Sequence, residues 1–205
     1  MFISFEGIEG SGKSTQIDLI ENSFCLNGYS VQKFREPGTT KLGEKIRNIF
    51  LEKTNEAVDP ITEAYLLYAS RKHLDQNLLR KSLENGSIVI ADRYSDATLA
   101  YQCYGKGLDA KFINYIHEAS NLLSPDLTFY MDISAELSEE RISNRERDRM
   151  ESESISFFKR VREGYLQIAK ENTERIVTLD ASKTIEEIHS LIKEKINEKL
   201  NVSLD

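Results

Sequence analysis

Eight residues near the N-terminus have the types and spacing of a phosphate-binding loop. They fit the pattern G-x-x-x-x-G-K-S/T and read Gly7-Ile8-Glu9-Gly10-Ser11-Gly12-Lys13-Ser14. Glycines let the backbone wrap an anion without a Cβ in the way, and successive N–H groups and the following helix N-terminus point at it. In such a loop the Lys13 ammonium reaches the β- and γ-phosphates of a nucleotide, and the Ser14 hydroxyl binds Mg²⁺. The alternative, a glycine-rich turn with an exposed lysine, leaves unexplained why three of the ten glycines lie in one loop.

A carboxylate that follows a predicted strand could complete the metal site. Asp92 ends the apolar run 88–91 and precedes Arg93. From there it could hold Mg²⁺ directly or through water, beside the phosphate-binding loop. Asp132, at the end of another predicted strand, is the rival, but capping of the following turn is the favoured interpretation for it.

Several arginines have positions that solubility alone does not explain. Arg71 lies on an otherwise apolar helical stripe with spacings of 4, 3 and 4, formed by Leu67, Arg71, Leu74 and Leu78. A charge on a core-facing stripe is costly unless it is paired, so Arg71 either binds a buried carboxylate or contacts a ligand. Arg93 lies at the predicted active edge. Arg35 begins the loop after the second predicted strand, where it either pairs with Glu36 or faces a ligand.

Residues 141–149 contain four arginines in a protein that is acidic overall: Arg141, Arg145, Arg147 and Arg149. One interpretation is a solvated helix end with ion pairs to Glu146, Asp148 and Glu151. The other is a mobile lid that closes over a triphosphate and places a guanidinium on the transferring group. Composition alone leaves both open.

The chain contains no evident pair of nucleophile and activating base. The three histidines fit structural or surface positions, Cys25 fits a core position, and Cys103 lacks an activating motif. A phosphate monoester suits this lack, because it is already an oxyanion near neutral pH and needs positioning rather than deprotonation. An alcohol acceptor would need a general base. Glu9 could be that base, which keeps a nucleoside kinase as an alternative.

The elements that must position these residues follow from short apolar runs that alternate with amphipathic segments. Strands are expected at 2–5, 31–34, 88–91, 127–131 and 176–179, and helices at 13–27, 42–51, 60–84, 110–123, 137–144, 153–172 and 185–200. This alternation predicts an α/β protein in which helices cover both faces of a parallel sheet. Ligands of such folds bind at the carboxyl ends of the strands.

Composition narrows the class of protein further. The 205 residues are 40% hydrophobic and 30% charged, which is typical of one soluble domain. The net charge of −7 argues against nucleic acid as a partner. No apolar run approaches a membrane span, the N-terminus does not resemble a secretory signal, and two cysteines form no disulfide framework. We therefore expect a reduced, cytoplasmic protein.

Together these features resemble the thymidylate kinase family, which makes dTDP from dTMP. Besides the loop, the resemblance rests on Arg35-Glu36-Pro37-Gly38, Leu67-Tyr68-Ala69-Ser70-Arg71, Asp92-Arg93-Tyr94, Ala100-Tyr101-Gln102 and Asp148-Arg149-Met150-Glu151. It runs over nearly the whole chain. It implies a P-loop NTPase fold with strand order 2-3-1-4-5, a small lid at about 141–152, one domain over residues 1–205, and a homodimer formed through helix faces.

The resemblance also implies roles for individual residues. ATP would be held with Mg²⁺ by Gly7, Ile8, Glu9, Gly10, Ser11, Gly12, Lys13, Ser14 and Thr15, with Ser14 and Asp92 at the metal. The acceptor dTMP would contact Glu9, Arg35, Arg47, Tyr68, Arg71, Arg93, Thr98, Tyr101 and Gln102. Of these, Arg47 and Arg93 would grip its phosphate and Arg71 its thymine carbonyl. The catalytic set would be Lys13, Glu9, Arg93 and the lid arginines Arg145, Arg147 and Arg149. A lid arginine is implied because Gly10 occupies a position where some members carry an arginine.

Two positions depart from the family pattern. Leu67 stands where an aromatic residue often stacks on thymine, so Tyr68 is expected to take that role. Ala97 stands where serine is frequent, and Thr98 is expected to supply the hydroxyl. The sequence therefore predicts transfer of the ATP γ-phosphoryl group to dTMP. A kinase for another nucleotide or a nucleoside, and a P-loop nucleotide switch, are the alternatives.

Overall fold

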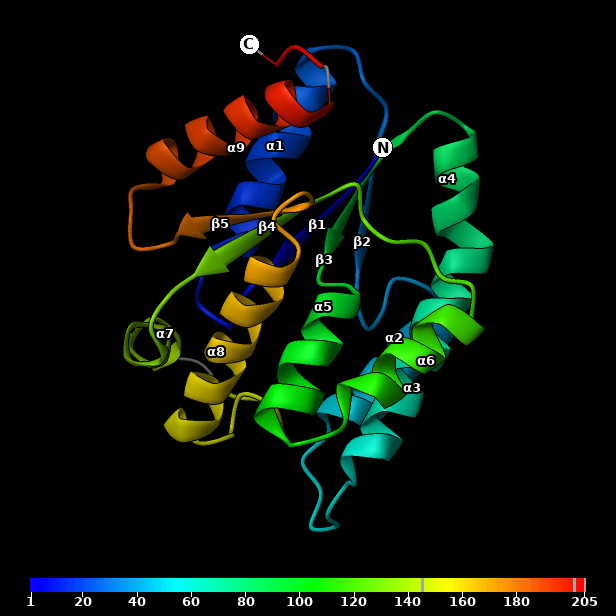
Figure 1. The fold of residues 1–205 in the computed structure, drawn as a ribbon, viewed down its shortest axis with the longest axis vertical. Helices are drawn as coiled ribbons and strands as arrows, with labels where there is room; N and C mark the ends of the chain where they lie inside the picture. The colour runs from blue at the N-terminus through cyan, green and yellow to red at the C-terminus, as the bar shows by residue number, and fades with distance from the viewer. Residues whose placement is uncertain (145, 201, 205) are drawn as a thin grey trace.

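The centre of the protein is a five-stranded parallel sheet (Figure 1). The computed structural model describes residues 1–144, 146–200 and 202–204. Its strands are β1 (Phe2–Glu6), β2 (Val31–Arg35), β3 (Ile88–Asp92), β4 (Leu127–Asp132) and β5 (Ile176–Asp180). Their order is β2-β3-β1-β4-β5, so the predicted α/β class and strand order are confirmed.

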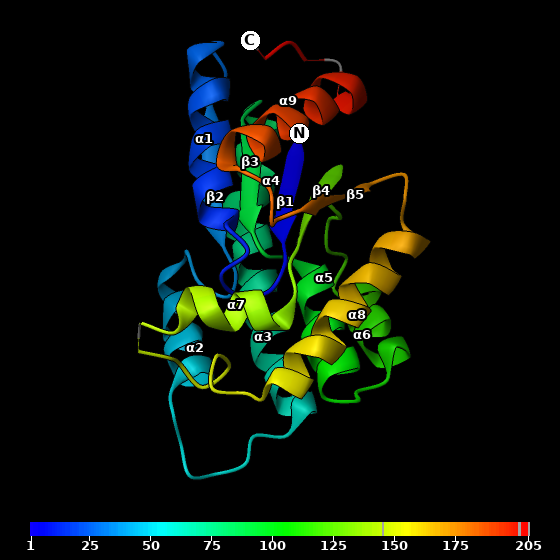
Figure 2. The ribbon, with the colours of Figure 1, turned by 90° about the vertical axis from the view of Figure 1, so that its left-hand side faces the viewer.

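Helices surround this sheet. They are α1 (Lys13–Leu26), α2 (Lys41–Leu51), α3 (Pro60–Leu74), α4 (Arg80–Glu84), α5 (Ser95–Thr98), α6 (Ala110–Ala119), α7 (Ala135–Ile142), α8 (Ile155–Glu171) and α9 (Ile185–Leu200), with π-helical segments η1 (Asp75–Leu79) and η2 (Leu99–Gly105). Figure 2 shows α1 and α8 on opposite sides of the strands. No helix within the described ranges is long and apolar enough to cross a membrane.

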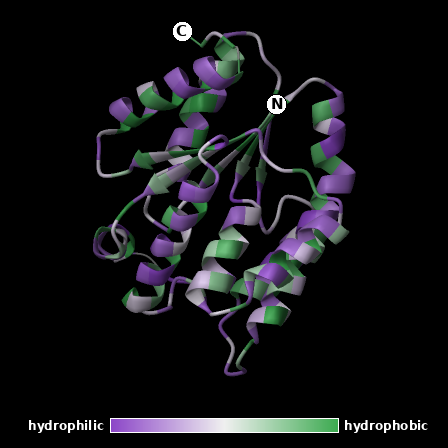
Figure 3. Cartoon of the chain, in the orientation of Figure 1, coloured by the Kyte–Doolittle hydropathy of each residue, from purple (hydrophilic) through white to green (hydrophobic). Residues whose placement is uncertain are grey.

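The three inner strands form from apolar runs that are buried on both faces, whereas the edge strands β2 and β5 are partly exposed. All five residues of β1 are buried, as expected for the central strand of a parallel sheet. Figure 3 shows hydrophobic and hydrophilic stretches alternating along the helices, as expected for helices that cover a core with one face. Buried polar groups in the sheet are paired, as where the Ser4 and Thr128 hydroxyls lie 2.7 Å apart.

The main difference from the sequence-based expectation is the helical stretch that contains α5 and η2. It was missed because its residues are buried on several sides and show no amphipathic period. Gly105 and Gly164 allow η2 and α8 to pack closely, since a Cβ on Gly164 would lie 2.6 Å from the Cβ of Tyr104. The expected helix at 60–84 is interrupted by η1, and that at 110–123 ends at Ala119.

Cys25 lies in a different environment from the one that the sequence predicts. Cys25 was expected in the core but is exposed. The buried positions of α1 are Lys13, Gln16, Ile17, Ile20 and Phe24, and Cys25 follows them on the outer face. A small apolar residue next to a buried aromatic does not have to share its face, because each helical residue turns by about 100°.

Candidate active site

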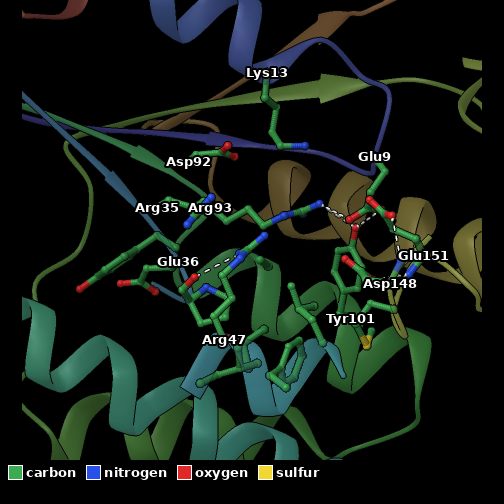
Figure 4. Close-up of a pocket in the computed structure, with 18 of the residues that line it drawn as sticks. Glu9, Lys13, Arg35, Glu36, Arg47, Asp92, Arg93, Tyr101, Asp148 and Glu151 are labelled. Carbon is green, nitrogen blue, oxygen red and sulfur yellow. Dashed lines mark hydrogen bonds and ion pairs between the residues drawn. The ribbon is translucent and has the colours of Figure 1, made fainter. Parts of the chain in front are cut away.

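A cavity of about 650 Å³ lies at the carboxyl ends of the strands. Its walls come from the loop after β1, the turn after β2, the end of β3, α3, η2 and the segment around 148–151. Figure 4 shows Lys13 and Arg47 entering it from opposite sides. The topology therefore brings together residues that are far apart in the sequence.

The phosphate-binding loop takes the conformation that its glycines permit. Gly7, Gly10 and Gly12 have φ values of +138°, +73° and +87°, which favour glycine. A Cβ on Gly7 would lie 2.6 Å from the carbonyl oxygen of Met131. The loop leads directly into the N-terminus of α1, where unpaired N–H groups and the helix dipole attract anions.

Lys13 lies inside this loop and is largely buried. Its Nζ donates to the carbonyl oxygens of Gly7 (2.9 Å) and Ile8 (3.2 Å). Burial, together with the positive charge of Arg93, lowers the pKa of Lys13 to about 8. A bound phosphate would favour the protonated amine, so the loop is suited to an anionic ligand.

Arg93 and Glu9 form a charged cluster beside Lys13, since Nη1 of Arg93 donates to the same Gly7 carbonyl oxygen as Lys13 (2.9 Å each). Nη2 of Arg93 donates to Oε1 of Glu9 (2.5 Å) and to the Tyr101 hydroxyl (3.1 Å), which itself donates to Oε2 of Glu9 (2.9 Å). Arg93 has φ +69°, a conformation uncommon for residues with a Cβ. Burial raises the pKa of Glu9, but the charges of Arg93 and Lys13 outweigh it and hold that pKa below its usual value. Glu9 is therefore an ionised acceptor and a weak base.

Glu6, which sequence reasoning missed, supports Arg93 from behind. It is wholly buried and accepts hydrogen bonds from the Tyr94 N–H (2.7 Å) and the Tyr165 hydroxyl (2.9 Å). Burial, with the nearby charge of Asp96, raises the pKa of Glu6 to about 8. The carboxyl thus fixes the backbone next to Arg93. The only sequence signal was an acidic residue at the end of a buried strand.

Arg71 combines the two interpretations that its sequence position allowed. It is 2% exposed, and its Nε donates to Oε2 of Glu36 (2.6 Å), which is 3% exposed. Nη2 donates to the Tyr94 carbonyl and the Thr98 hydroxyl, both at 3.1 Å. Nη1 has no hydrogen-bond partner within the described part of the chain, and Arg71 lines the cavity. A buried donor without a partner indicates a place for a ligand acceptor.

Tyr68, expected to stack on the base, is not among the residues that line the cavity. Its ring lies outside the cavity, packs 4.7 Å from the Arg71 guanidinium, and its hydroxyl donates to the Ile113 carbonyl. Leu67 lines the cavity instead. Residues three and four positions before Arg71 differ by about 100° around α3, which is enough to send one behind the arginine and the other toward the ligand space. Tyr68 therefore supports Arg71.

The remaining acceptor-side arginines differ in how firmly they are held. Arg47 lines the cavity and donates to the Pro37 carbonyl (3.1 Å), and burial and the charge of Arg35 lower its pKa. Arg35 also lines the cavity. It pairs with Glu44 (3.0 Å) rather than with Glu36, because Glu36 is bound to Arg71. Crowded cations beside one cavity favour an anion there.

Oxygen groups that suit Mg²⁺ lie next to the loop. Ser14 and Asp92 both line the cavity. Asp132, the rival, does not line it and binds Arg162 through both oxygens (2.7 and 2.9 Å). Within the described ranges no group of three or more His, Cys, Asp or Glu residues could hold a metal. Mg²⁺ binds through few protein oxygens, and ligand phosphates and water complete its coordination.

The arginine-rich segment is tied down unevenly. Arg149 donates to the Phe50 carbonyl (2.9 Å) and to Glu63 (2.6 Å), whereas Arg147 pairs with Glu139 (2.6 Å). Arg145 lies outside the described residues. Arg141, expected in the lid but not among the catalytic candidates, lines the cavity and donates to the Gly10 and Ala181 carbonyls at 3.0 and 3.2 Å.

Two wall residues had no motif that could have revealed them, namely Phe50 and Leu51. Met150, in the motif at 148–151, and Ala97, which departs from the family pattern, line the cavity as well, next to Thr98, Tyr101 and Gln102. Buried Glu63 does have a signal in retrospect, because it lies four residues before Leu67 on the stripe that contains Arg71. A second charge on that stripe indicates a second buried pair.

A phosphate-binding loop at the edge of a parallel sheet, facing a second group of cations across one cavity, defines a P-loop phosphotransferase with two anionic substrates. Comparison with known proteins identifies the family within this class. The family model for thymidylate kinase matches residues 5–192.

Individual relatives agree. A thymidylate kinase of Sulfurihydrogenibium sp. strain YO3AOP1 is 44% identical over 199 residues, which cover 97% of each chain. One of Chlorobaculum tepidum is 43% identical over 208 residues, covering 96% of this chain and 97% of the other. The crystal structure of thymidylate kinase from Ehrlichia chaffeensis superposes with a TM-score of 0.78 at 32% identity, covering 96% and 98% of the two chains.

The chain therefore belongs to the thymidylate kinase family, as the sequence predicted. Members of this family are nucleoside-monophosphate kinases that phosphorylate dTMP to dTDP with ATP. The family assignment favours this reaction over a nucleoside kinase or a nucleotide switch.

Proposed function

We propose that this chain transfers the γ-phosphoryl group of ATP to the phosphate of dTMP in the cavity at the carboxyl ends of the strands. The observation that carries the proposal is the placement of two cationic groups around one space. Lys13 and Arg93 lie at the phosphate-binding loop, where both donate to the Gly7 carbonyl, and Arg47 lies across from them. Such an arrangement suits two phosphate tails that meet end to end.

At the donor end, the amides of residues 7–15 would bind the ATP phosphates, and Lys13 would move from its loop carbonyls to the β- and γ-phosphates. Mg²⁺, bound with Ser14 and Asp92, would neutralise charge on these phosphates. Arg141 fixes α7 against the loop through the Gly10 carbonyl, and the Ser138 hydroxyl does so through the Glu9 carbonyl (2.7 Å).

At the acceptor end, Arg47, Arg93 and Arg35 would hold the dTMP phosphate in line. A phosphate monoester is ionised near neutral pH, so no base is needed. The lowered pKa of Glu9 makes it a poor general base but a good acceptor for a sugar hydroxyl, with Tyr101 beside it. This argues against phosphorylation of a nucleoside alcohol.

Around the base, Arg71 would donate to the thymine carbonyl O4 through Nη1, which has no partner among the described residues. Leu67 and Ala97 supply an apolar wall, and Gln102 faces the same space. Thr98 supports Arg71, because its hydroxyl accepts from Nη2.

Among the lid arginines, we propose that Arg149 is an anchor, because it is held by buried Glu63 and by a backbone carbonyl. Arg147 pairs with the partly exposed Glu139, and such a pair is worth little in water. Arg147, together with Arg145, is therefore the candidate that reaches the transferring phosphoryl group when the lid closes.

We further propose a cytoplasmic, single-domain protein over residues 1–205 that forms a homodimer and binds no nucleic acid. Ile49, Tyr65 and Tyr115 on α2, α3 and α6 are 61%, 57% and 70% exposed. These three helices lie together (Figure 1). Exposed apolar groups on adjacent helices suit a self-complementary contact with a second copy. Free cysteines suit a reducing compartment, and the net charge of −7 does not suit nucleic acid.

The test is the rate of ADP release with Mg-ATP across a panel of nucleoside monophosphates and nucleosides. We expect dTMP to be the preferred acceptor, and Lys13→Ala to lower kcat by about 100-fold or more. Lys81→Ala, on α4 away from the cavity, is the matched control and should leave the rate unchanged. Turnover of thymidine with dTMP inert, or ATP hydrolysis that no acceptor accelerates, would refute the proposal.

A further inference from the structure

Glu63 forms a buried junction behind the base end of the cavity. It lies on α3 with no exposed surface and accepts hydrogen bonds from three donors. Nε2 of Gln102 lies 3.0 Å from Oε2, and Nζ of Lys106 and Nη1 of Arg149 lie 2.7 and 2.6 Å from Oε1. Glu63 itself does not line the cavity, whereas Gln102 does.

These contacts decide which end of the Gln102 amide faces the cavity. A carboxylate between two cations can only accept hydrogen bonds, so the NH₂ group of Gln102 must point to Glu63. Its Oε1 is then left for another partner, and it has none within the part of the chain that the structure describes. A buried amide oxygen without a partner beside a cavity is an acceptor available to a ligand.

Gln102 and Arg71 therefore offer a base one acceptor and one donor. The Oε1 of Gln102 accepts, and the Nη1 of Arg71, also without a partner among the described residues, donates. Thymine has an N3–H donor next to its O4 acceptor, whereas cytosine has an N3 acceptor next to a 4-amino donor. The Gln102 acceptor and the Arg71 donor therefore complement N3–H and O4 of thymine. At cytosine they would place an acceptor against N3 and a donor against the 4-amino group.

We propose that Glu63 is a positioning residue that sets selectivity for bases with an N3–H donor, by holding the Gln102 amide with its carbonyl toward the base. Without the carboxylate, Gln102 could turn over and offer its NH₂ group to the N3 of cytosine. Lys106 and Arg149 both donate to Oε1 of Glu63, which leaves Oε2 for the Gln102 amide. This inference rests on the proposed function, because it assumes that the base of the acceptor nucleotide binds at Gln102.

The test is the ratio of kcat/KM for dTMP to kcat/KM for dCMP at saturating Mg-ATP. Glu63→Gln keeps the size of the side chain but can donate as well as accept, so it no longer fixes the amide. We expect the ratio to fall about tenfold or more, mainly through a higher KM for dTMP, while the KM for ATP stays unchanged. Any effect through Arg149 would act on both acceptors equally and leave the ratio unchanged.

Lys106→Met is the matched control, because it removes one cation from Glu63 and leaves the bond to Gln102. Its ratio should stay within about threefold of the wild type. Gln102→Met should lower the ratio by itself, and adding Glu63→Gln to it should change the ratio no further. An unchanged ratio in folded Glu63→Gln, an equal loss in Lys106→Met, or additive losses in the double variant would overturn the proposal.

A measurement on the wild-type enzyme covers the case in which Glu63→Gln does not fold. N3-methyl-dTMP lacks the N3–H, so its inhibition constant should be about tenfold or more higher than the Kd of dTMP. Equal binding of the two would overturn the assigned orientation of Gln102. If wild-type enzyme turned over no dTMP at all, the proposed function itself would fall. Normal dTMP turnover with equal binding of the methylated analogue would refute this inference alone.

Discussion

The buried pair of Arg71 and Glu36 should make a large and separable contribution to stability and to substrate binding. Arg71→Met would leave Glu36 without its cation at a position that is 3% exposed. Removing one partner of such a pair costs about 3–5 kcal/mol, because an uncompensated charge stays buried. At about 2–4 °C per kcal/mol for a chain of this size, the expected fall in Tm is about 6–20 °C.

The stability that Arg71→Met loses relative to the wild type should depend on pH. Burial raises the pKa of Glu36 to about 7, and Arg71 opposes this rise. Without Arg71 the pKa of native Glu36 rises further, so above about pH 7 folding must take up a proton that the wild type does not need. The stability deficit should therefore be larger at pH 8.5 than at pH 6. Urea unfolding at both pH values measures it.

A second substitution separates the two effects. Arg71→Met with Glu36→Leu replaces the pair by apolar groups and should recover about 2 kcal/mol or more of the lost stability. The KM for dTMP should stay about 10–100-fold above wild type in both variants, because the guanidinium that would bind the base is absent. Lys33→Met, which breaks partly exposed pairs with Asp18 and Glu21, should cost about 1 kcal/mol or less.

Two results would refute this reasoning. Arg71→Met as stable as wild type at pH 8.5 would mean that Glu36 is not an uncompensated charge there. A double variant that recovers the dTMP KM together with stability would mean that Arg71 acts on binding only through the fold.

Three further predictions concern the loop, the strand end beside it and the turn after β2. ATP affinity, measured by calorimetry from pH 6.5 to 9.5, should fall above about pH 8 as Lys13 loses its proton, whereas a flat wild-type profile would contradict this. Native Glu6 keeps a proton up to about pH 8 that the unfolded chain releases near 4.5, so stability falls as pH rises through this window. Glu6→Gln should remove that part of the slope in denaturant titrations, and Glu56→Gln, an exposed control, should not. Gly43→Ala would place a methyl group against the Gly38 carbonyl, so it should lower Tm and raise the KM for dTMP. Unchanged values would show that the turn can move to make room for the methyl group.

The phosphate-binding loop could be predicted in full because its chemistry is local. Its glycines, Lys13 and Ser14 are contiguous, and the preceding strand and following helix show their own periodicity. The helix at 95–105 could not be predicted in this way. Its residues are buried against α8 and other elements, so packing rather than amphipathic period determines it.

Partners across the site were beyond local reasoning. The sequence predicts that Arg71 needs a partner, but that partner, Glu36, is 35 residues away in the chain. Because Glu36 pairs with Arg71, Arg35 pairs with Glu44 instead. Residues three and four positions before Arg71 lie on the same broad face of the helix, so the sequence predicts Tyr68 at the cavity. Only the fold shows that Leu67 faces the cavity and that Tyr68 packs against Arg71.

By itself the sequence determined that this chain folds as strands alternating with helices and carries a phosphate-binding loop, because both depend on residues within one element or one turn. Its motifs also identified the family. The tertiary structure alone decided how Glu6, Glu36 and Glu63 are used. Each is buried among donors from distant segments, and only folding brings those donors within hydrogen-bond distance and removes the water that would otherwise screen the charges.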